Sequence, residues 1–335
     1  MSEFLFATDP TDRSDERFWS ERGRPLGEYA LGALGITSGQ ETHLIEGPDG
    51  RRLAIQLSGA PNGESAYLLH GSPGSRDHPA INPIELHQTN RQIITIDRPG
   101  YAFSDRKEGR SVVDAVADTR IAAQYLGIPP RYVIGISGGG PHALACAAEL
   151  EGVEKVVAAV SLAPTSVMGD EWFDGMLSPF NVEVFEAAMY CPEKVIGMLT
   201  TAATEILQQG YGKYDPQAVR GAHHAVRSVS SHRQGLRFGP YGWIDDTLAF
   251  VRDWRFDVRK IAVPALIWSA TEDIYTPLRH SERLAELIPG AKLHREASAK
   301  HAQATLTLTE MINWCLTGEY HAGAHHKSLI DHETI

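Results

Sequence analysis

The chain has 335 residues, a formal net charge of −11 and a composition typical of soluble globular proteins. This length allows one large domain, or one domain with a smaller unit inserted into it. The acidic balance, without any concentrated run of Lys or Arg, argues against nucleic acid as a partner and against an anionic membrane surface.

The cysteines and the N-terminus indicate a reducing compartment. Cys146, Cys191 and Cys315 are too few and too widely spaced for a disulfide framework or a C-x-x-C metal motif. The first ten residues lack the basic and then apolar pattern of a signal peptide. No run approaches the roughly 18 apolar residues of a membrane span. We therefore expect a cytoplasmic protein with reduced thiols.

The first half of the chain alternates strand and helix patterns after a charged, aromatic-containing arm at 1–39. Pro-Asp-Gly within Gly47–Gly50 separates two extended segments, which predicts a β-hairpin. Short apolar runs without clean alternation then predict strands buried on both faces of a sheet, at 65–70, 91–97, 131–135 and 156–161. Segments compatible with helices lie between them, at 83–88, 111–126 and 141–150.

The alternation stops between residues 164 and 255, where a helical segment rich in aromatics and Met predicts an inserted lid. It resumes with strands at 265–268 and 292–295 and helices at 278–287 and 302–316. The pattern predicts an α/β fold with a mostly parallel central sheet and helices on both faces. The expected core comprises residues 40–163 and 256–318, and a polar tail follows at 319–335.

The segment Gly135-Ile-Ser-Gly-Gly139 lies between a predicted strand and a predicted helix and fits G-x-S-x-G. In this motif the serine, here Ser137, sits on a strained strand-to-helix turn with its Oγ exposed. Glycines leave room where strand and helix pass closely. The helix N-terminus presents unpaired N–H groups suited to an oxyanion. An ordinary serine in a glycine-rich turn is the alternative, so the interpretation depends on partners downstream.

Candidate partners follow in the order that such a serine requires. A serine hydroxyl is a poor nucleophile without a base, and the base needs an orienting carboxylate. Asp273 lies in the loop after the strand at 265–268, and His301 lies in the loop after the strand at 292–295. Glu272 is the rival carboxylate. His280 and His294 are rival bases, but they lie within a predicted helix and a predicted strand.

Several motifs together resemble the α/β-hydrolase fold superfamily, in particular lid-bearing serine hydrolases of the prolyl aminopeptidase and esterase branch. His70–Gly74 resembles the H-G-x-P-G oxyanion loop. Asp97–Asp105 resembles D-x-x-G-x-G-x-S, with Ala102 in place of the second glycine. Glu272–Pro277 resembles the acid loop D-x-x-x-P. The resemblance covers about residues 41–316.

The resemblance implies a role for each matching residue. Ser137 would be the nucleophile, His301 the base and Asp273 the orienting acid, although Lys300 stands where a glycine often precedes the histidine. The backbone N–H groups of Ser72 and Gly138 would form the oxyanion hole.

Other histidines and acids receive structural interpretations. His70 and Asp97 are expected to hold their loops through hydrogen bonds. We expect no cofactor and no metal, because the remaining histidine clusters match no zinc pattern, namely His223, His224, His321, His325, His326 and His332.

Within the superfamily that this chain resembles, a serine at the elbow disfavours haloalkane dehalogenases and epoxide hydrolases, because those enzymes carry an aspartate there. The expected reaction is acyl-enzyme hydrolysis of a small, largely apolar ester or lactone. The expected substrate-binding residues lie in the lid and are apolar, namely Trp172, Phe173, Met176 and Phe180.

Other reactions stay open from sequence. Thioester, amide or C–C bond hydrolysis would use the same residues. Prolyl aminopeptidases bind the substrate amine through lid glutamates, and four are available here, Glu171, Glu183, Glu186 and Glu193. A cofactor-free oxygenase or lyase, or a ligand-binding receptor on the same scaffold, is a further alternative. The protein is a possible homo-oligomer.

Overall fold

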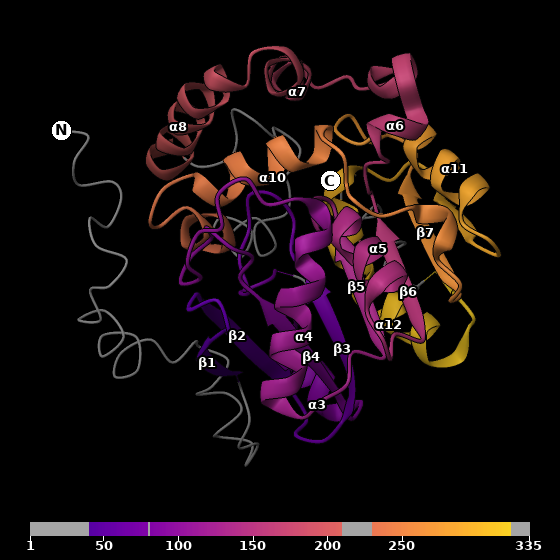
Figure 1. Cartoon of the computed structure of the whole chain (residues 1–335). Helices are drawn as coiled ribbons and strands as arrows, with labels where there is room; N and C mark the ends of the chain where they lie inside the picture. Colours follow the sequence, from indigo (N-terminus) through magenta and orange to yellow (C-terminus); the bar gives the residue numbers. More distant parts are fainter. Residues whose placement is uncertain (1–39, 80, 210–229, 323–335) are drawn as a thin grey trace, which may run out of the picture.

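The computed structural model describes residues 40–79, 81–209 and 230–322. An eight-stranded sheet of order β1-β2-β4-β3-β5-β6-β7-β8 forms its centre (Figure 1). Only β2 runs against its neighbours β1 and β4, and the other neighbouring pairs are parallel. This confirms the predicted mostly parallel sheet. The strands are β1 (Gln40–Glu46), β2 (Arg52–Gly59), β3 (Glu64–Leu69), β4 (Arg91–Ile96), β5 (Tyr132–Ile136), β6 (Lys155–Ala159), β7 (Ala265–Ala270) and β8 (Lys292–Glu296).

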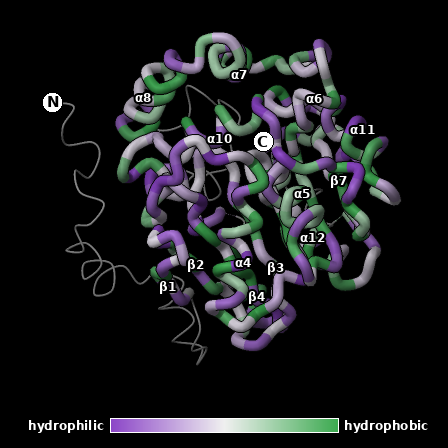
Figure 2. Tube along the Cα trace, viewed as in Figure 1, coloured by the Kyte–Doolittle hydropathy of each residue, from purple (hydrophilic) through white to green (hydrophobic). Residues whose placement is uncertain are grey.

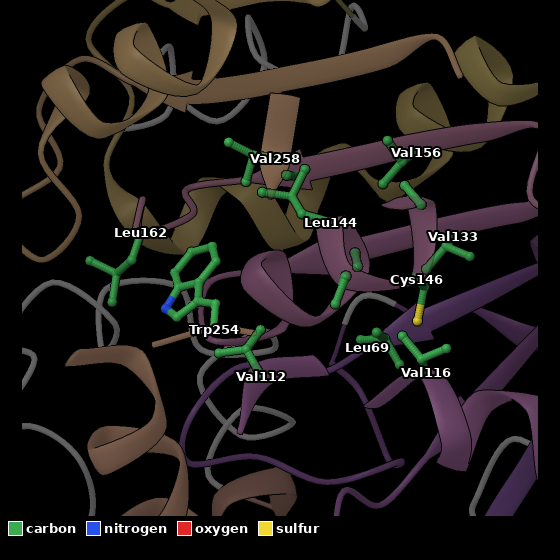
Figure 3. Close-up of a cluster of buried hydrophobic side chains, with 14 of the residues drawn as sticks. Leu69, Val112, Val116, Val133, Leu144, Cys146, Val156, Leu162, Trp254 and Val258 are labelled. Carbon is green, nitrogen blue, oxygen red and sulfur yellow. The ribbon is translucent and has the colours of Figure 1, made fainter. Parts of the chain in front are cut away.

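Helices cover both faces of this sheet, because its central strands bury alternate side chains on opposite sides. Val133 of β5 and Val156 of β6 pack on the face of α4 (Ala115–Leu126), α5 (Gly139–Glu149) and α11 (Leu278–Leu287) (Figure 3). Ile134 and Val157, one residue further on, pack on the face of α3 (Pro83–Gln88) and α12 (Leu308–Thr317). The absence of polar alternation in these strands is therefore a consequence of burial on both faces.

The helical segment between β6 and β7 contains α6 (Thr165–Met168), α7 (Pro179–Tyr190), α8 (Pro192–Gln209) and α10 (Tyr241–Val251). In Figure 1, α7 and α8 lie across the top of the view, with α10 between them and the sheet. The tube of Figure 2 shows polar and apolar residues interspersed along α8. Its buried apolar residues recur at helical spacing and join a small core shared with α7 and α10, at Val195, Leu199, Ala202, Ala203 and Ile206.

The chain after His301 differs from the prediction of a single helix over 302–316. A 3₁₀ segment, His301–Thr307, comes first, and α12 begins only at Leu308. The Thr305 and Thr307 hydroxyls donate to the Ala302 and Ala304 carbonyls, three residues back. Such side-chain bonds compete with α-helical backbone pairing.

The predictions for the two ends of the chain and for membrane spans can be compared with the structure only over the residues that it describes. The arm at 1–39 lies outside the described residues, as does the tail beyond residue 322. Within the described ranges, no helix is both long and apolar enough to cross a bilayer.

Candidate active site

Ser137 lies at the turn between β5 and α5. Its backbone φ of +56° is one that residues other than glycine rarely adopt. Its amide donates to the Ala159 carbonyl at 2.9 Å, which fixes the corner against β6. A Cβ on Gly139 would lie 2.0 Å from the Leu69 carbonyl oxygen, and one on Gly135 would lie 2.3 Å from the Gly139 carbonyl oxygen. Because the obstructing atoms belong to the backbone, only glycine fits at these two positions.

The structure brings Ser137, His301 and Asp273 into one hydrogen-bonded chain. His301 Nε2 lies 2.9 Å from Ser137 Oγ, and His301 Nδ1 lies 2.7 Å from Asp273 Oδ2. These contacts give Nδ1 the proton and leave Nε2 to accept the serine proton, which is the arrangement a general base needs. Ser137 follows β5, Asp273 follows β7 and His301 follows β8, so three strand ends supply the three side chains.

Asp273 is held as a buried carboxylate. Its oxygens accept hydrogen bonds from the Tyr275 amide at 2.8 Å and from the Thr276 amide and hydroxyl at 3.1 and 2.5 Å. Burial acts to raise the pKa of Asp273, but the charge of protonated His301 and these hydrogen bonds lower it below its ordinary value. The carboxylate is thus ionised and its orientation is fixed. Glu272, the rival acid, is exposed.

Ser72 and Gly138 lie against each other beside Ser137. A Cβ on Gly138 would lie 2.3 Å from Ser72 Oγ and 3.0 Å from the Ser72 nitrogen. Neither the Ser72 nor the Gly138 amide has an acceptor within the described ranges of the chain. Two adjacent unpaired donors beside the Ser137 hydroxyl are the arrangement that an oxyanion hole would require.

His70 and Asp97 hold loops, in keeping with their interpretation from sequence. His70 Nδ1–H donates to the Gly71 carbonyl at 2.7 Å, and its Nε2 accepts the Arg98 amide at 3.2 Å. Burial, followed by the charge of Arg98, lowers the pKa of His70 well below its ordinary value, so the ring is neutral. Asp97 accepts the Arg76 amide at 2.6 Å and also pairs with the Arg76 side chain.

A cavity of about 180 Å³ opens at Ser137 and His301. Helix α7 contributes Phe180, Asn181, Val184 and Phe185, and helix α10 contributes Trp243, Thr247 and Phe250. On each helix these positions recur every three or four residues, which places them on one face of the helix. This wall is mainly apolar.

Of the four residues expected to bind substrate, the structure places only Phe180 at the cavity. Trp172 is fully buried and donates its indole N–H to the Ala163 carbonyl at 3.0 Å. Phe173 and Met176 pack with it against the main core. All three lie in or near a short 3₁₀ turn that precedes α7 and faces the core, so their apolar character serves packing.

The other cavity residues of α7 and α10 were missed from sequence. Their helical spacing is visible in the sequence and could have defined a face. It could not have shown whether that face meets the sheet, the neighbouring helix or a cavity, because this depends on tertiary packing.

The four glutamates considered for amine binding all lie on the exposed surface, and Glu171 pairs there with Arg279. No Asp or Glu is among the cavity-lining residues of the described chain. Over the same ranges, no group of three or more His, Cys, Asp or Glu is placed to hold a metal ion. Among the histidines considered as metal ligands, only His321 lies within the described residues, where it contacts Glu319.

Comparison with known proteins agrees with this architecture. The family model for the α/β hydrolase fold matches residues 67–304. A proline iminopeptidase from Lacticaseibacillus rhamnosus is 26% identical over 259 residues, which cover 73% of this chain and 87% of that protein. Since the family model spans well over half of the sequence, the chain belongs to the α/β hydrolase fold family.

Solved structures extend the comparison of the fold. An esterase from Exiguobacterium antarcticum aligns with a TM-score of 0.59 and 23% identity, covering 83% of this chain and 97% of its own. A bromoperoxidase from Bacillus anthracis aligns with a TM-score of 0.60 and 21% identity, covering 82% and 98%. Identities this low establish the shared fold and leave the reaction to be argued from the site.

Proposed function

We propose that the protein is a serine hydrolase that cleaves a small, largely apolar ester or lactone through an acyl-enzyme. The observation that carries this proposal is the hydrogen-bonded chain from Ser137 through His301 to Asp273 at the mouth of an apolar cavity. The esterase and iminopeptidase among the similar proteins are in keeping with hydrolysis.

In the proposed mechanism, Ser137 Oγ attacks the carbonyl carbon while His301 Nε2 takes the hydroxyl proton. The Ser72 and Gly138 amides donate to the oxyanion of the tetrahedral intermediate. His301 then returns the proton to the leaving alcohol, and the acyl-enzyme forms. A water molecule, activated by the same histidine, releases the carboxylic acid and restores Ser137. Asp273 keeps the imidazole in the tautomer that can accept the proton.

The cavity favours a neutral acyl group over the free amine of an aminopeptidase substrate. A buried ammonium group needs a carboxylate partner, and the described cavity lining offers none. We propose that α7, α8 and α10 act as the lid, with α7 and α10 facing the substrate. Amide or C–C bond hydrolysis remains the second choice, since it would use the same nucleophile and base.

A phosphonate activity probe tests the nucleophile. We expect intact-mass labelling that maps to Ser137, and a fall of about 10⁶-fold in kcat for p-nitrophenyl butyrate in Ser137→Ala. Asp273→Asn should lower kcat by roughly 10⁴-fold, because the histidine tautomer is no longer fixed. The matched control Glu272→Gln, one residue away on the surface, should retain activity.

Other outcomes would support the alternatives. Turnover that requires His301 but survives Ser137→Ala would indicate an oxygenase or lyase reaction. A wild-type protein that binds small molecules but neither reacts with the probe nor turns over esters, lactones or amino-acid arylamides would indicate a receptor.

A further inference from the structure

A buried charged cluster lies directly behind the loop that carries Ser72. Its centre is Asp246 of α10, whose side chain is fully buried. One carboxylate oxygen, Oδ2, accepts hydrogen bonds at 2.5–2.7 Å from Ser72 Oγ, Arg98 and the Tyr101 hydroxyl. The other, Oδ1, lies 2.5 Å from Arg110 and 3.1 Å from His142 Nε2.

Asp246 is charged despite its burial. Burial acts to raise the pKa of Asp246, but the charges of Arg110 and Arg98 outweigh it and hold the pKa well below its ordinary value. Two guanidinium groups face this one carboxylate, and one of them, Arg98, also contacts the Ser72 loop. A buried ionic cluster of this kind is costly to desolvate and is weak evidence for stability.

The cluster reaches three consecutive residues of the loop. Arg98 donates to the His70 carbonyl, to the Gly71 carbonyl at 3.2 Å and to Ser72 Oγ at 2.9 Å. The single hydroxyl proton of Ser72 goes to Asp246. The group that Ser72 can offer to a substrate oxygen is therefore its amide N–H. The orientation of that amide is set by the hydrogen bonds of the preceding Gly71 carbonyl and of Ser72 Oγ.

Helix α10 also lies close to the neighbouring turn at Gly100 and Tyr101, and this approach depends on glycine at both Gly100 and Gly242. A Cβ on Gly242 would lie 2.4 Å from the Tyr101 ring, and the Gly242 amide donates to the Gly100 carbonyl at 3.0 Å. The same helix also lines the cavity, with Trp243, Thr247 and Phe250. Helix α10 thus contributes to the cavity wall and also anchors the oxyanion loop.

We propose that Asp246 and Arg98 are positioning residues, which aim the Ser72 amide, together with the Gly138 amide, at the developing oxyanion. This inference rests on the serine-hydrolase function proposed above. Neither residue touches the substrate. They act through Ser72, and their effect is on the transition state, where the carbonyl oxygen becomes charged.

The test compares Ser72→Ala and Asp246→Asn with wild type. Ser72→Ala keeps the amide and removes only the hydroxyl that ties it to the cluster. The matched control is Asp245→Asn, the neighbouring carboxylate, which pairs with Arg106 at 2.8 Å and makes no contact with the Ser72 loop in the described chain. Each variant is measured for kcat and KM with p-nitrophenyl butyrate, for inhibition by an alkyl trifluoromethyl ketone, and for Tm.

We expect kcat to fall about 10- to 100-fold in Ser72→Ala and Asp246→Asn, with KM within about twofold of wild type. The ketone, which mimics the oxyanion, should lose affinity by the same factor as kcat. A purely structural role would instead lower Tm or change KM without that correlation. Asp245→Asn should match wild type in both kcat and ketone affinity.

The outcomes separate the two proposals. If folded Ser72→Ala keeps kcat and ketone affinity within twofold of wild type, the positioning role is wrong although the serine mechanism stands. If wild type is not labelled at Ser137 and turns over no ester, both proposals fall together. Should Asp246→Asn not fold, Ser72→Ala decides the question alone.

Discussion

At the scale of single residues, hydrogen bonds fix buried His70 and His280 in one tautomer each. His280 is the clearest case. Its Nδ1 accepts the Ala163 amide at 2.9 Å, and its Nε2–H donates to the Trp172 carbonyl at 2.7 Å. A proton on Nδ1 would break the first bond and bury a charge. Burial is the main cause that lowers the pKa of His280 to about 4.

This arrangement predicts acid sensitivity. In the unfolded chain a histidine takes up a proton near pH 6.5, whereas folded His280 does so only near pH 4. Between these values the unfolded state binds more protons, so the free energy of unfolding falls as pH falls, by about 3 kcal/mol for this residue. Urea unfolding of wild type and His280→Gln at several pH values measures the effect.

The variant should be less stable at pH 7 and should show a shallower decline between pH 6.5 and 4. His321→Gln, which changes an exposed histidine, serves as the control and should keep the wild-type slope. An equally steep decline in His280→Gln would show that His280 is not the group responsible.

At the scale of elements, the sequence predicts best what depends on local pattern. Short apolar runs predict the strands, and closely spaced glycines predict the turn around Ser137. The structure has these elements at the expected places. The approach of His301 to Ser137 could be anticipated only from the order of motifs. The cavity wall was predicted poorly, because apolar character alone does not distinguish Trp172 in the core from Val184 at the cavity. No local sequence pattern predicted the buried charged cluster at Asp246, because the partners of Asp246 come from four separate segments of the chain.

Two glycine substitutions test the physical basis of the elbow. Gly139→Ala would press a methyl group onto the Leu69 carbonyl, and we expect a loss of about 1–3 kcal/mol in stability together with loss of the proposed esterase activity. Gly197→Ala is the matched control. Gly197 is exposed in the interior of α8, with no atom near its would-be Cβ, so the change should stabilise α8 by about 0.5–1 kcal/mol.

Thermal unfolding and ester turnover measure both variants. A Gly139→Ala protein with wild-type Tm and activity would mean that the elbow can relax, and that glycine is not required there. A fall in Tm for Gly197→Ala would contradict the helix-propensity argument for α8.

At the scale of the whole molecule, the site lies between the central sheet and the helices that link β6 to β7. The sheet and its covering helices supply Ser137, Asp273 and His301 at strand ends. The helices between β6 and β7 supply the wall, and they pack partly in a small core that includes Tyr101 and partly, through Phe185 and Phe250, in the main core. This arrangement follows the general rule that functional side chains lie on loops held by a rigid scaffold. It also implies that a change on α7, which supplies none of Ser137, Asp273 and His301, can alter substrate preference without altering reactivity.

That independence predicts the effect of narrowing the wall. Val184 of α7 is buried and lines the cavity, so Val184→Phe should exclude long acyl chains while leaving the hydrogen bonds among Ser137, His301 and Asp273 intact. We expect kcat/KM for p-nitrophenyl octanoate to fall about 10- to 100-fold, with less than threefold change for the acetate. Ile196→Phe, an equivalent change on the exposed face of α8, should leave both values at wild type. If Val184→Phe lowered acetate and octanoate turnover equally, the acyl chain would not lie along α7, and the wall would influence the chemistry itself.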